Sequence, residues 1–285
     1  MSSTTNETGP SITTATISFL VTPADKSVEL FAMAHPDPVT GERKSNYERE
    51  NKQIFIENLR GKEDSVTLDT AGFQFFHAPA AHKTFANDEE IQREYYSESV
   101  ELIKKLTGAS RVVIFDHTVR RRNPDQVGDS PGKHQPVAQA HVDQSVAAAV
   151  ARVHRHLPES EVPELLKKRY QIINLWRPIS HPAWDWPLAV CDYRSVDPEK
   201  DTVPIAFLYP DRKGQTLSVK YNPNQKWKYL YGMTPDEIIL IKCSDSLQDG
   251  SVSVFTPHTA FDDPATPKGS PFRQSIELRS LVFYD

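Results

Sequence analysis

A series of short β-favouring runs through the second half of the chain most constrains its fold. Branched and aromatic residues dominate each run, and Pro, Gly, Asn or Asp residues separate the runs, which is typical of strands joined by turns. Short strands repeated in this way favour a β-barrel or β-sandwich. We predict such strands over residues 188–193, 204–209, 216–221, 237–243, 251–255 and 274–284.

The first half of the chain mixes strands and helices. Apolar residues at helical spacing predict a helix over 88–106 that Gly108 ends, and Ser145 is placed to cap a second helix. Strands are predicted in 12–31, 53–59, 73–77, 110–117, 137–143 and 169–177, with a polar loop over 120–136. The chain is therefore expected to be mainly β with flanking helices, as one domain over 12–285 behind a disordered leader, 1–11.

Composition narrows the functional classes. A net charge of −5 argues against sequence-independent nucleic-acid binding, which needs a basic face. No apolar run reaches the length needed to cross a membrane, and no Gly-rich phosphate loop is present in the sequence. Two cysteines form neither a disulfide framework nor a thiolate zinc site, so a reducing cytoplasm is the expected location.

One motif carries metal chemistry, the sequence His141-Val142-Asp143 in a strand-like run. Side chains two residues apart in a strand share a face, so the imidazole and the carboxylate point the same way. His258, just past a late strand, is the best candidate for a third ligand. Two histidines and one carboxylate form the facial triad of non-haem Fe(II) oxygenases, although the same set also holds Zn(II) or Mn(II).

A second motif, Arg273-Gln274-Ser275, follows the distal histidine. The planar guanidinium grips a carboxylate with two hydrogen bonds, and a serine two residues on adds a third from the same strand face. This pair suits the far carboxylate of 2-oxoglutarate. Arg279 shares the face of Arg273 and is the alternative anchor.

Several longer stretches resemble a family of Fe(II)/2-oxoglutarate-dependent dioxygenases of fungal and bacterial secondary metabolism. That family includes gibberellin desaturases, aspergillic-acid-type hydroxylase/desaturases and a cephamycin-biosynthesis methoxylation protein. The resemblance extends from about residue 12 to the end of the chain. Its most distinctive parts are Asn174-Leu-Trp-Arg-Pro178 and His258-Thr-Ala-Phe261, and it also includes 114–120, 141–143 and 187–192.

The resemblance implies a double-stranded β-helix, a cupin-like jelly roll. It further implies an Fe(II) centre at His141, Asp143 and His258, with 2-oxoglutarate and O₂ as co-substrates. The expected reaction is hydroxylation or desaturation of a small natural product, with succinate and CO₂ as co-products. Two alternatives remain open, a Zn(II) or Mn(II) isomerase or hydrolase on the same scaffold, and a non-catalytic binding protein.

Five other residues are site candidates from their place in the pattern. Asn174 and Trp176 share a strand face on which Asn174 could bind the co-substrate and Trp176 could wall the substrate pocket. His117 follows a strand and is a candidate for the pocket mouth. Trp184 lies in a Pro-rich loop that could cover an apolar substrate, and Arg279 is the second co-substrate candidate.

Overall fold

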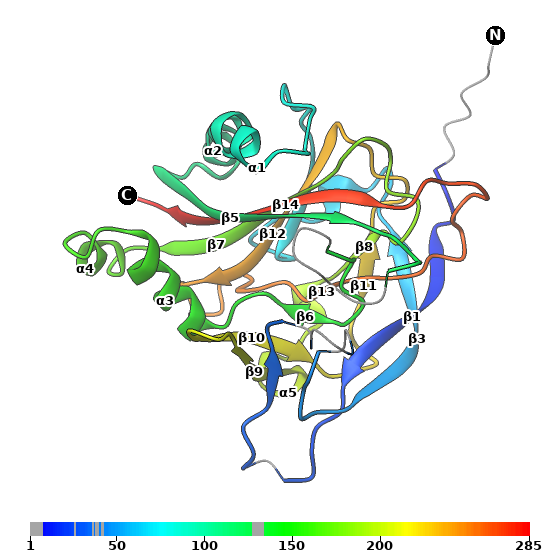
Figure 1. The fold of residues 1–285 in the computed structure, drawn as a ribbon, viewed down its shortest axis with the longest axis horizontal. Helices are drawn as coiled ribbons and strands as arrows, with labels where there is room; N and C mark the ends of the chain where they lie inside the picture. The colour runs from blue at the N-terminus through cyan, green and yellow to red at the C-terminus, as the bar shows by residue number, and fades with distance from the viewer. Residues whose placement is uncertain (1–7, 26, 36, 38–39, 41–42, 127–133) are drawn as a thin grey trace.

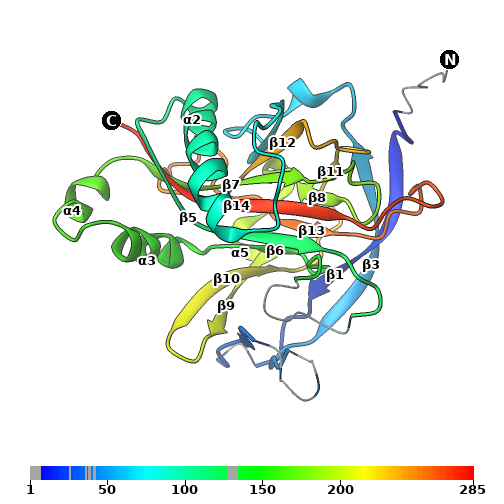
Figure 2. The ribbon, with the colours of Figure 1, turned by 45° about the horizontal axis from the view of Figure 1, so that its top comes forward.

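Two curled β-sheets, drawn in Figures 1 and 2, make up most of the protein. The computed structural model describes residues 8–25, 27–35, 37, 40, 43–126 and 134–285. Part of the predicted leader, residues 1–7, lies outside this range. Just after it, the Asn58 side chain donates hydrogen bonds to the carbonyls of Thr8 (2.7 Å) and Pro10 (3.0 Å), so this short stretch is held against the neighbouring strand.

The smaller sheet has five antiparallel strands in the order β4-β12-β7-β14-β5. Their bounds are Phe73–His77, Glu237–Asp245, Tyr170–Pro178, Gln274–Phe283 and Arg111–Arg121. The central strand β7 is buried along its whole length, because apolar layers cover both faces of the sheet.

The larger sheet has nine strands in the order β1-β3-β11-β8-β13-β6-β10-β9-β2. Their bounds are Ile12–Leu20, Arg49–Asn58, Trp227–Tyr229, Leu188–Cys191, His258–Ala260, His141–Val142, Lys213–Val219, Thr202–Leu208 and Phe31–Met33. From β5 to β8 and again from β11 to β14, successive strands alternate between the two sheets. This alternation is the double-stranded β-helix, so the predicted mainly β jelly roll is confirmed.

Helices flank the sheets, as predicted. α1 (Asp88–Glu90), a π-helical turn and α2 (Tyr96–Thr107) form one continuous stretch that ends at Gly108, whose φ of 73° is the left-handed conformation glycine favours. The Ser145 hydroxyl accepts a hydrogen bond from the Ala148 amide at the start of α3 (Val146–His156). Two short helices, α4 (Val162–Leu165) and α5 (Pro198–Asp201), complete the set. No helix in the described ranges is long and apolar enough to cross a membrane.

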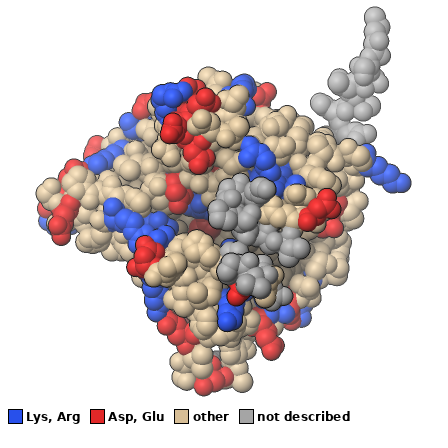
Figure 3. All heavy atoms as spheres, viewed as in Figure 1, with Lys and Arg blue, Asp and Glu red and all other residues tan. Residues whose placement is uncertain are grey.

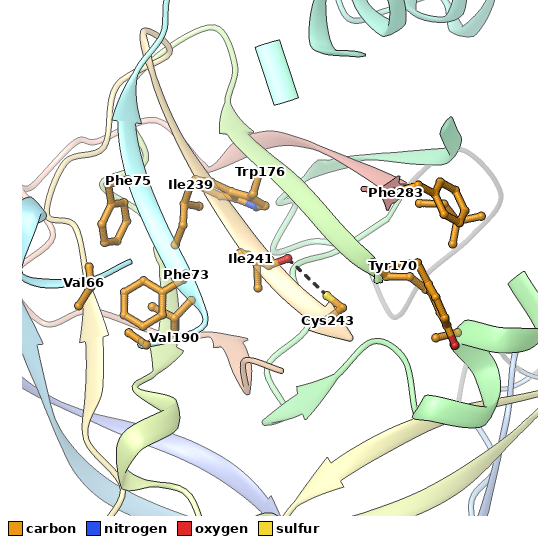
Figure 4. Close-up of a cluster of buried hydrophobic side chains, with 14 of the residues drawn as sticks. Val66, Phe73, Phe75, Tyr170, Trp176, Val190, Ile239, Ile241, Cys243 and Phe283 are labelled. Atoms are coloured by element: carbon orange, nitrogen blue, oxygen red, sulfur yellow. Dashed lines mark hydrogen bonds between the residues drawn. The ribbon is translucent and has the colours of Figure 1, made fainter. Parts of the chain in front are cut away.

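A cluster of buried side chains extends across the inner face of the smaller sheet (Figure 4). Phe73 and Phe75 meet edge to face with ring centroids 5.8 Å apart, and Ile239 and Ile241 extend from the adjoining strand. One side of α3 closes this cluster with Ala149 and Val153. The core therefore sets the position of α3 beside the β6 strand that carries His141.

The sequence expectations differ from the structure in three elements. Residues 251–255 form no strand, and the three-residue strand β11 was not predicted. Arg120 and Arg121, predicted to begin a loop, belong to β5, where Arg120 pairs with Ser275 of β14. Pairing with an already formed neighbour extends a strand beyond its apolar residues, and the local pattern contains no sign of that partner.

Candidate functional site

The two residues of the His-x-Asp motif lie where β6 ends. His141 is in β6, and Asp143 follows directly after it. The carbonyl of Gln139 lies 2.7 Å from His141 Nδ1, so Nδ1 carries the proton and donates. This hydrogen bond leaves the lone pair of Nε2 for a metal, as is usual for histidine ligands.

His258 reaches the same point from β13, the strand beside β6. The two histidines are paired across the ladder, and their ring centroids are 4.5 Å apart. His258 Nδ1 donates to the Thr256 carbonyl at 3.0 Å, which again leaves Nε2 unprotonated. The possible ligand atoms of His141, Asp143 and His258 all lie within 4.8 Å of one another. Residues more than a hundred positions apart in the sequence thus form one cluster.

Charge and burial set the protonation of this cluster. Burial, with a contribution from the neighbouring His141, lowers the pKa of His258 to about 4, so its imidazole is neutral at physiological pH. Burial alone would raise the pKa of Asp143, but the Arg279 guanidinium and the two imidazoles hold it well below its usual value. The neutral His258 imidazole and the ionised Asp143 carboxylate are thus ready to bind a divalent cation without first losing protons.

Asp143 is held through its second oxygen. Its Oδ1 lies 3.3 Å and 3.8 Å from the Nε2 atoms of His141 and His258, whereas its Oδ2 accepts hydrogen bonds from Asn174 Nδ2 (2.8 Å) and Arg279 Nε (2.9 Å). These two donors come from β7 and β14, so the smaller sheet orients a ligand carried by the larger one. Such outer contacts orient ligands and tune metal affinity.

Arg279 is fully engaged by its own sheet. Its guanidinium contacts Asp116 at 3.1 Å, Thr118 at 3.0 Å and Glu277 at 2.7 Å, in addition to Asp143. With four acceptors around it, this side chain has little capacity left for a co-substrate carboxylate. The structure therefore places Arg279 behind the metal cluster, and Asn174 with it.

Arg273 and Ser275 lie at the start of the same strand and keep unused polar atoms. Arg273 is 2% exposed; its Nη1 donates to the Trp186 carbonyl at 2.5 Å, and its guanidinium lies 5.7 Å from the Trp176 ring. Arg273 Nε and Ser275 Oγ have no hydrogen-bond partner within the described part of the chain. Burial, together with nearby Arg120, lowers the pKa of Arg273 to about 9. Unsatisfied buried donors are costly, so these two atoms are available to a hydrogen-bonding partner.

A cavity of about 800 Å³ opens beside the cluster. His141, Asp143 and Arg279 line its inner end, and its walls come from β5, α3, the β9–β10 hairpin and the segment around β2. A volume of this size is typical of small-molecule sites. A molecule of natural-product size can therefore reach the metal cluster through this cavity.

Three predicted pocket residues do not line this cavity. His117 lies on the outer face of β5, where its Nδ1 is 2.8 Å from the Tyr96 hydroxyl of α2, so its placement at the pocket mouth is wrong. Trp176 belongs to the apolar core and packs under Arg273. Trp184 packs edge to face on Tyr231 with ring centroids 4.9 Å apart. Strand alternation predicts that neighbours point apart, but it does not identify the face that will be the inner one.

Sequence reasoning missed the wall that β5 contributes. Asp116, Thr118 and Arg120 occupy alternate positions of this strand and all face the cavity. Their period of two was a usable signal, because polar residues at i, i+2 and i+4 of a strand share one face. The prediction of a loop over residues 120–136 missed this pattern, because it placed Arg120 outside the strand.

Fold and site together define a class: a double-stranded β-helix enzyme with a two-histidine, one-carboxylate metal site at the inner end of a cavity. The donor set fits Fe(II), since it offers imidazole and carboxylate ligands and no thiolate. Comparison with known proteins agrees with this class. A family model described as "Oxidoreductase/YMDC permease-like domain" matches residues 17–283.

Curated fungal proteins match most of the chain. The hydroxylase/desaturase efuI of Hormonema carpetanum is 33% identical over 81% of this chain and 83% of its own length. The Fe(II)/2-oxoglutarate-dependent dioxygenase nvfI of Aspergillus novofumigatus is 31% identical over 93% of this chain and 94% of its own. The hydroxylase/desaturase CTB9 of Cercospora beticola is 36% identical over 83% and 78%.

A solved structure shows the same fold. The iron and alpha-ketoglutarate-dependent endoperoxidase NvfI superposes with a TM-score of 0.82 at 28% identity, covering 96% of this chain and 98% of the other. The chain therefore belongs to the family of Fe(II)/2-oxoglutarate-dependent dioxygenases and hydroxylase/desaturases of fungal secondary metabolism, as its sequence resemblance predicted.

Proposed function

We propose that the protein is an Fe(II)/2-oxoglutarate-dependent oxygenase whose iron is held by His141, Asp143 and His258. The observation that carries this assignment is the convergence of the three ligand atoms within 4.8 Å. Both histidines are fixed through Nδ1, so their Nε2 atoms face the same point. The cluster opens onto a cavity, which leaves room for exchangeable ligands on the metal.

Arg273 and Ser275 are the residues that bind the distal carboxylate of 2-oxoglutarate. The buried Arg273 Nε and Ser275 Oγ have no partner among the described residues, and both lie on the strand face that carries Arg279 toward the metal cluster. A guanidinium and a hydroxyl supply the charge-assisted hydrogen bonds that a carboxylate requires. Asn174 and Arg279, both bonded to Asp143 Oδ2, act as positioning residues for that ligand.

When bound, Fe(II) and 2-oxoglutarate supply an O₂-derived oxidant for C–H bonds, with succinate and CO₂ as co-products. The protein's own contribution is geometric. The buried His258 excludes water from its side of the metal cluster, and the cavity walls would hold one C–H bond of a small natural product near the metal. The position of that bond decides between hydroxylation, desaturation and other oxidations.

The assignment is tested with Fe(II), 2-oxoglutarate and variants of the ligands. Under anaerobic conditions, the wild type should form a weak visible charge-transfer band when Fe(II) and 2-oxoglutarate are both added. His141→Ala and Asp143→Ala should form none, and in air they should lose succinate production. His154→Ala is the matched control because this histidine is exposed on α3 and does not line the cavity.

The same measurement separates the alternatives. A site that binds Zn(II) or Mn(II) but gives no band with Fe(II) and 2-oxoglutarate would support an isomerase or hydrolase. Purified protein that retains no metal and cannot be reconstituted would support a non-catalytic binding role. Near-normal succinate formation by both ligand variants would refute the ligand assignment itself.

The proposal also includes the domain organisation, the partners and the cellular location of the enzyme. Residues 12–285 act as one catalytic domain with O₂ and a small-molecule substrate as partners. Cys191 and Cys243 are both buried free thiols, which is consistent with a reducing cytoplasm.

A further inference from the structure

The substrate cavity is far more basic than the protein as a whole. Among the described residues that line it, seven are arginine and one is lysine, whereas Asp116 and Asp143 are the only carboxylates. The chain overall carries a net charge of −5. Asp143 belongs to the metal cluster, and Asp116 accepts a hydrogen bond from Arg279 at 3.1 Å. The cavity therefore holds a local excess of positive charge.

The cations on one wall are already neutralised from outside the cavity. Arg212 pairs with Asp211 at 3.2 Å, and Lys213 forms an ion pair with Glu29. These residues belong to the β9–β10 hairpin. They need no ligand to balance their charge.

Arg152 and Arg155 on α3 have no such ion-pair partner among the described residues. No carboxylate in the described part of the chain lies within ion-pair distance of either guanidinium, and both side chains line the cavity. Arg152 is half-buried, with its guanidinium 4.9 Å from the Phe115 ring. Figure 3 shows basic side chains gathered over the part of the surface where α3 lies, next to a hollow.

These two arginines repel each other unless an anion lies between them. Residues three apart on a helix are neighbours on its surface, and like charges there are destabilising. Burial lowers the pKa of Arg152, Asp116 opposes that shift, and Arg155 adds to it. A carboxylate of the ligand would remove this repulsion and make charge-assisted hydrogen bonds to both forks.

Apolar and small side chains form part of the cavity wall. Ala147, Ala148 and Ala151 of α3 leave space along the cavity, and Ile205 and Phe207 of β9 also line it. Such a surface accepts the hydrocarbon part of a ligand without leaving polar groups unpaired. Charge and shape thus describe a molecule with one anionic end and one apolar body.

We propose that the substrate is an amphipathic carboxylic acid whose carboxylate binds Arg152 and Arg155 while its apolar body lies between α3 and β9. This inference rests on the proposed function, because it concerns the substrate of the same metal site. It assigns Arg152 and Arg155 a role in substrate selection that is separate from the 2-oxoglutarate anchor at Arg273.

The test uses 1-pyrenebutyrate and its neutral methyl ester as probes. The protein is first loaded with Fe(II) and 2-oxoglutarate without oxygen, so that the co-substrate position is filled, and probe binding is measured by equilibrium dialysis. The acid should bind about tenfold more tightly than the ester, and added salt should reduce that preference.

Single substitutions identify the responsible residues. Arg152→Gln and Arg155→Gln should each weaken acid binding severalfold and leave ester binding and the charge-transfer band unchanged. Arg155 is exposed, so its variant is not expected to disturb folding. Lys105→Gln, which removes an exposed positive charge from α2 outside the cavity, is the matched control and should change nothing.

The outcomes distinguish a failure of the proposed substrate class from a failure of the proposed function. A wild-type protein that forms the charge-transfer band but binds acid and ester equally overturns the substrate class alone. Equal binding of the acid by the wild type and both arginine variants also overturns it. Absence of the band in the wild type overturns the proposed function instead.

Discussion

Arg279 Nε lies 2.9 Å from Asp143 Oδ2, the carboxylate oxygen farther from the two imidazoles. The guanidinium thus neutralises one side of Asp143 and leaves Oδ1 toward the histidines. Because Asp143 follows a strand of the larger sheet and Arg279 belongs to the smaller one, this contact ties the two sheets together at the metal cluster. The geometry of the ligand set thus depends on how the sheets are packed together.

Removing Arg279 should weaken metal binding without removing a ligand. Arg279→Gln removes one of the two donors that hold Asp143 Oδ2 and leaves the carboxylate uncompensated by a positive charge, so we expect Fe(II) affinity to fall by about 10- to 100-fold. Arg279→Lys keeps the charge and should be intermediate. Anaerobic Fe(II) titration at saturating 2-oxoglutarate measures the effect.

A buried arginine on the other face of the sheet provides the control. Arg177 bonds the Tyr95 hydroxyl and the Pro235 carbonyl and is also buried. Arg177→Gln should lower thermal stability but leave Fe(II) affinity unchanged. Unaltered iron binding in Arg279→Gln would show that Asp143 needs no external support.

Loss of Arg273 should act on the co-substrate alone. Arg273→Gln removes the charged fork from the proposed carboxylate site, so we expect the KM for 2-oxoglutarate to rise by about 100-fold while Fe(II) affinity is retained. Ser275→Ala should raise it only a few-fold, since it removes one neutral hydrogen bond. Steady-state succinate formation at varied 2-oxoglutarate measures both variants. An unchanged KM in Arg273→Gln would show that another residue binds the distal carboxylate of 2-oxoglutarate.

Both cysteines should be inert in the folded protein. Burial raises the pKa of the Cys191 thiol to about 12, and burial with the nearby Asp143 and Glu277 carboxylates raises the pKa of the Cys243 thiol well above its usual value. The reactive thiolate is present only near or above the pKa, so at pH 8 it is almost absent from the folded state. Labelling with a thiol-specific disulfide reagent should detect no fast-reacting thiol in native protein and two in denaturant. Rapid labelling of native protein would contradict this burial.

Lys242 should be among the most sensitive positions for stability. It is fully buried in β12, and its ammonium contacts Asp245 at 2.8 Å and Asp69 at 2.9 Å. Lys242→Ala leaves a buried carboxylate short of a partner, so the free energy of unfolding should fall by about 3–5 kcal/mol in urea titrations. The exposed pair Lys167–Glu164 provides the contrast, and Lys167→Ala should cost little. Equal losses in the two variants would contradict the argument.

The local sequence pattern was sufficient to predict which residues share a face of a strand or helix. Asn174 and Trp176 share one face of β7 and Arg177 points from the other, as strand alternation predicted. The helix after Ser145 and the long helix ending at Gly108 also followed from capping and spacing. Each of these features is set within a few residues of the chain, so the sequence contains the needed information.

The local sequence pattern did not predict contacts that depend on residues far away in the chain. The sequence favoured Arg273 as the co-substrate anchor but left Arg279 open as an alternative. Only the packing of β14 against β7 and β5 engages Arg279 with Asp143 and Asp116, whereas Arg273, just before β14, keeps an unpaired donor among the described residues. His117 was assigned to the cavity because its strand was recognised but the inner face of that strand was not. Only the position of α3 in the structure shows that Arg152 and Arg155 line the cavity.

The amino-acid sequence by itself determined the kinds of ligand, their order along the chain and the mainly β character of the fold, because residue chemistry and strand periodicity are local properties. Only the tertiary structure decided which of these side chains meet. Antiparallel pairing of β6 with β13 brings His141 opposite His258, and such long-range registers depend on the burial of whole sheets against each other.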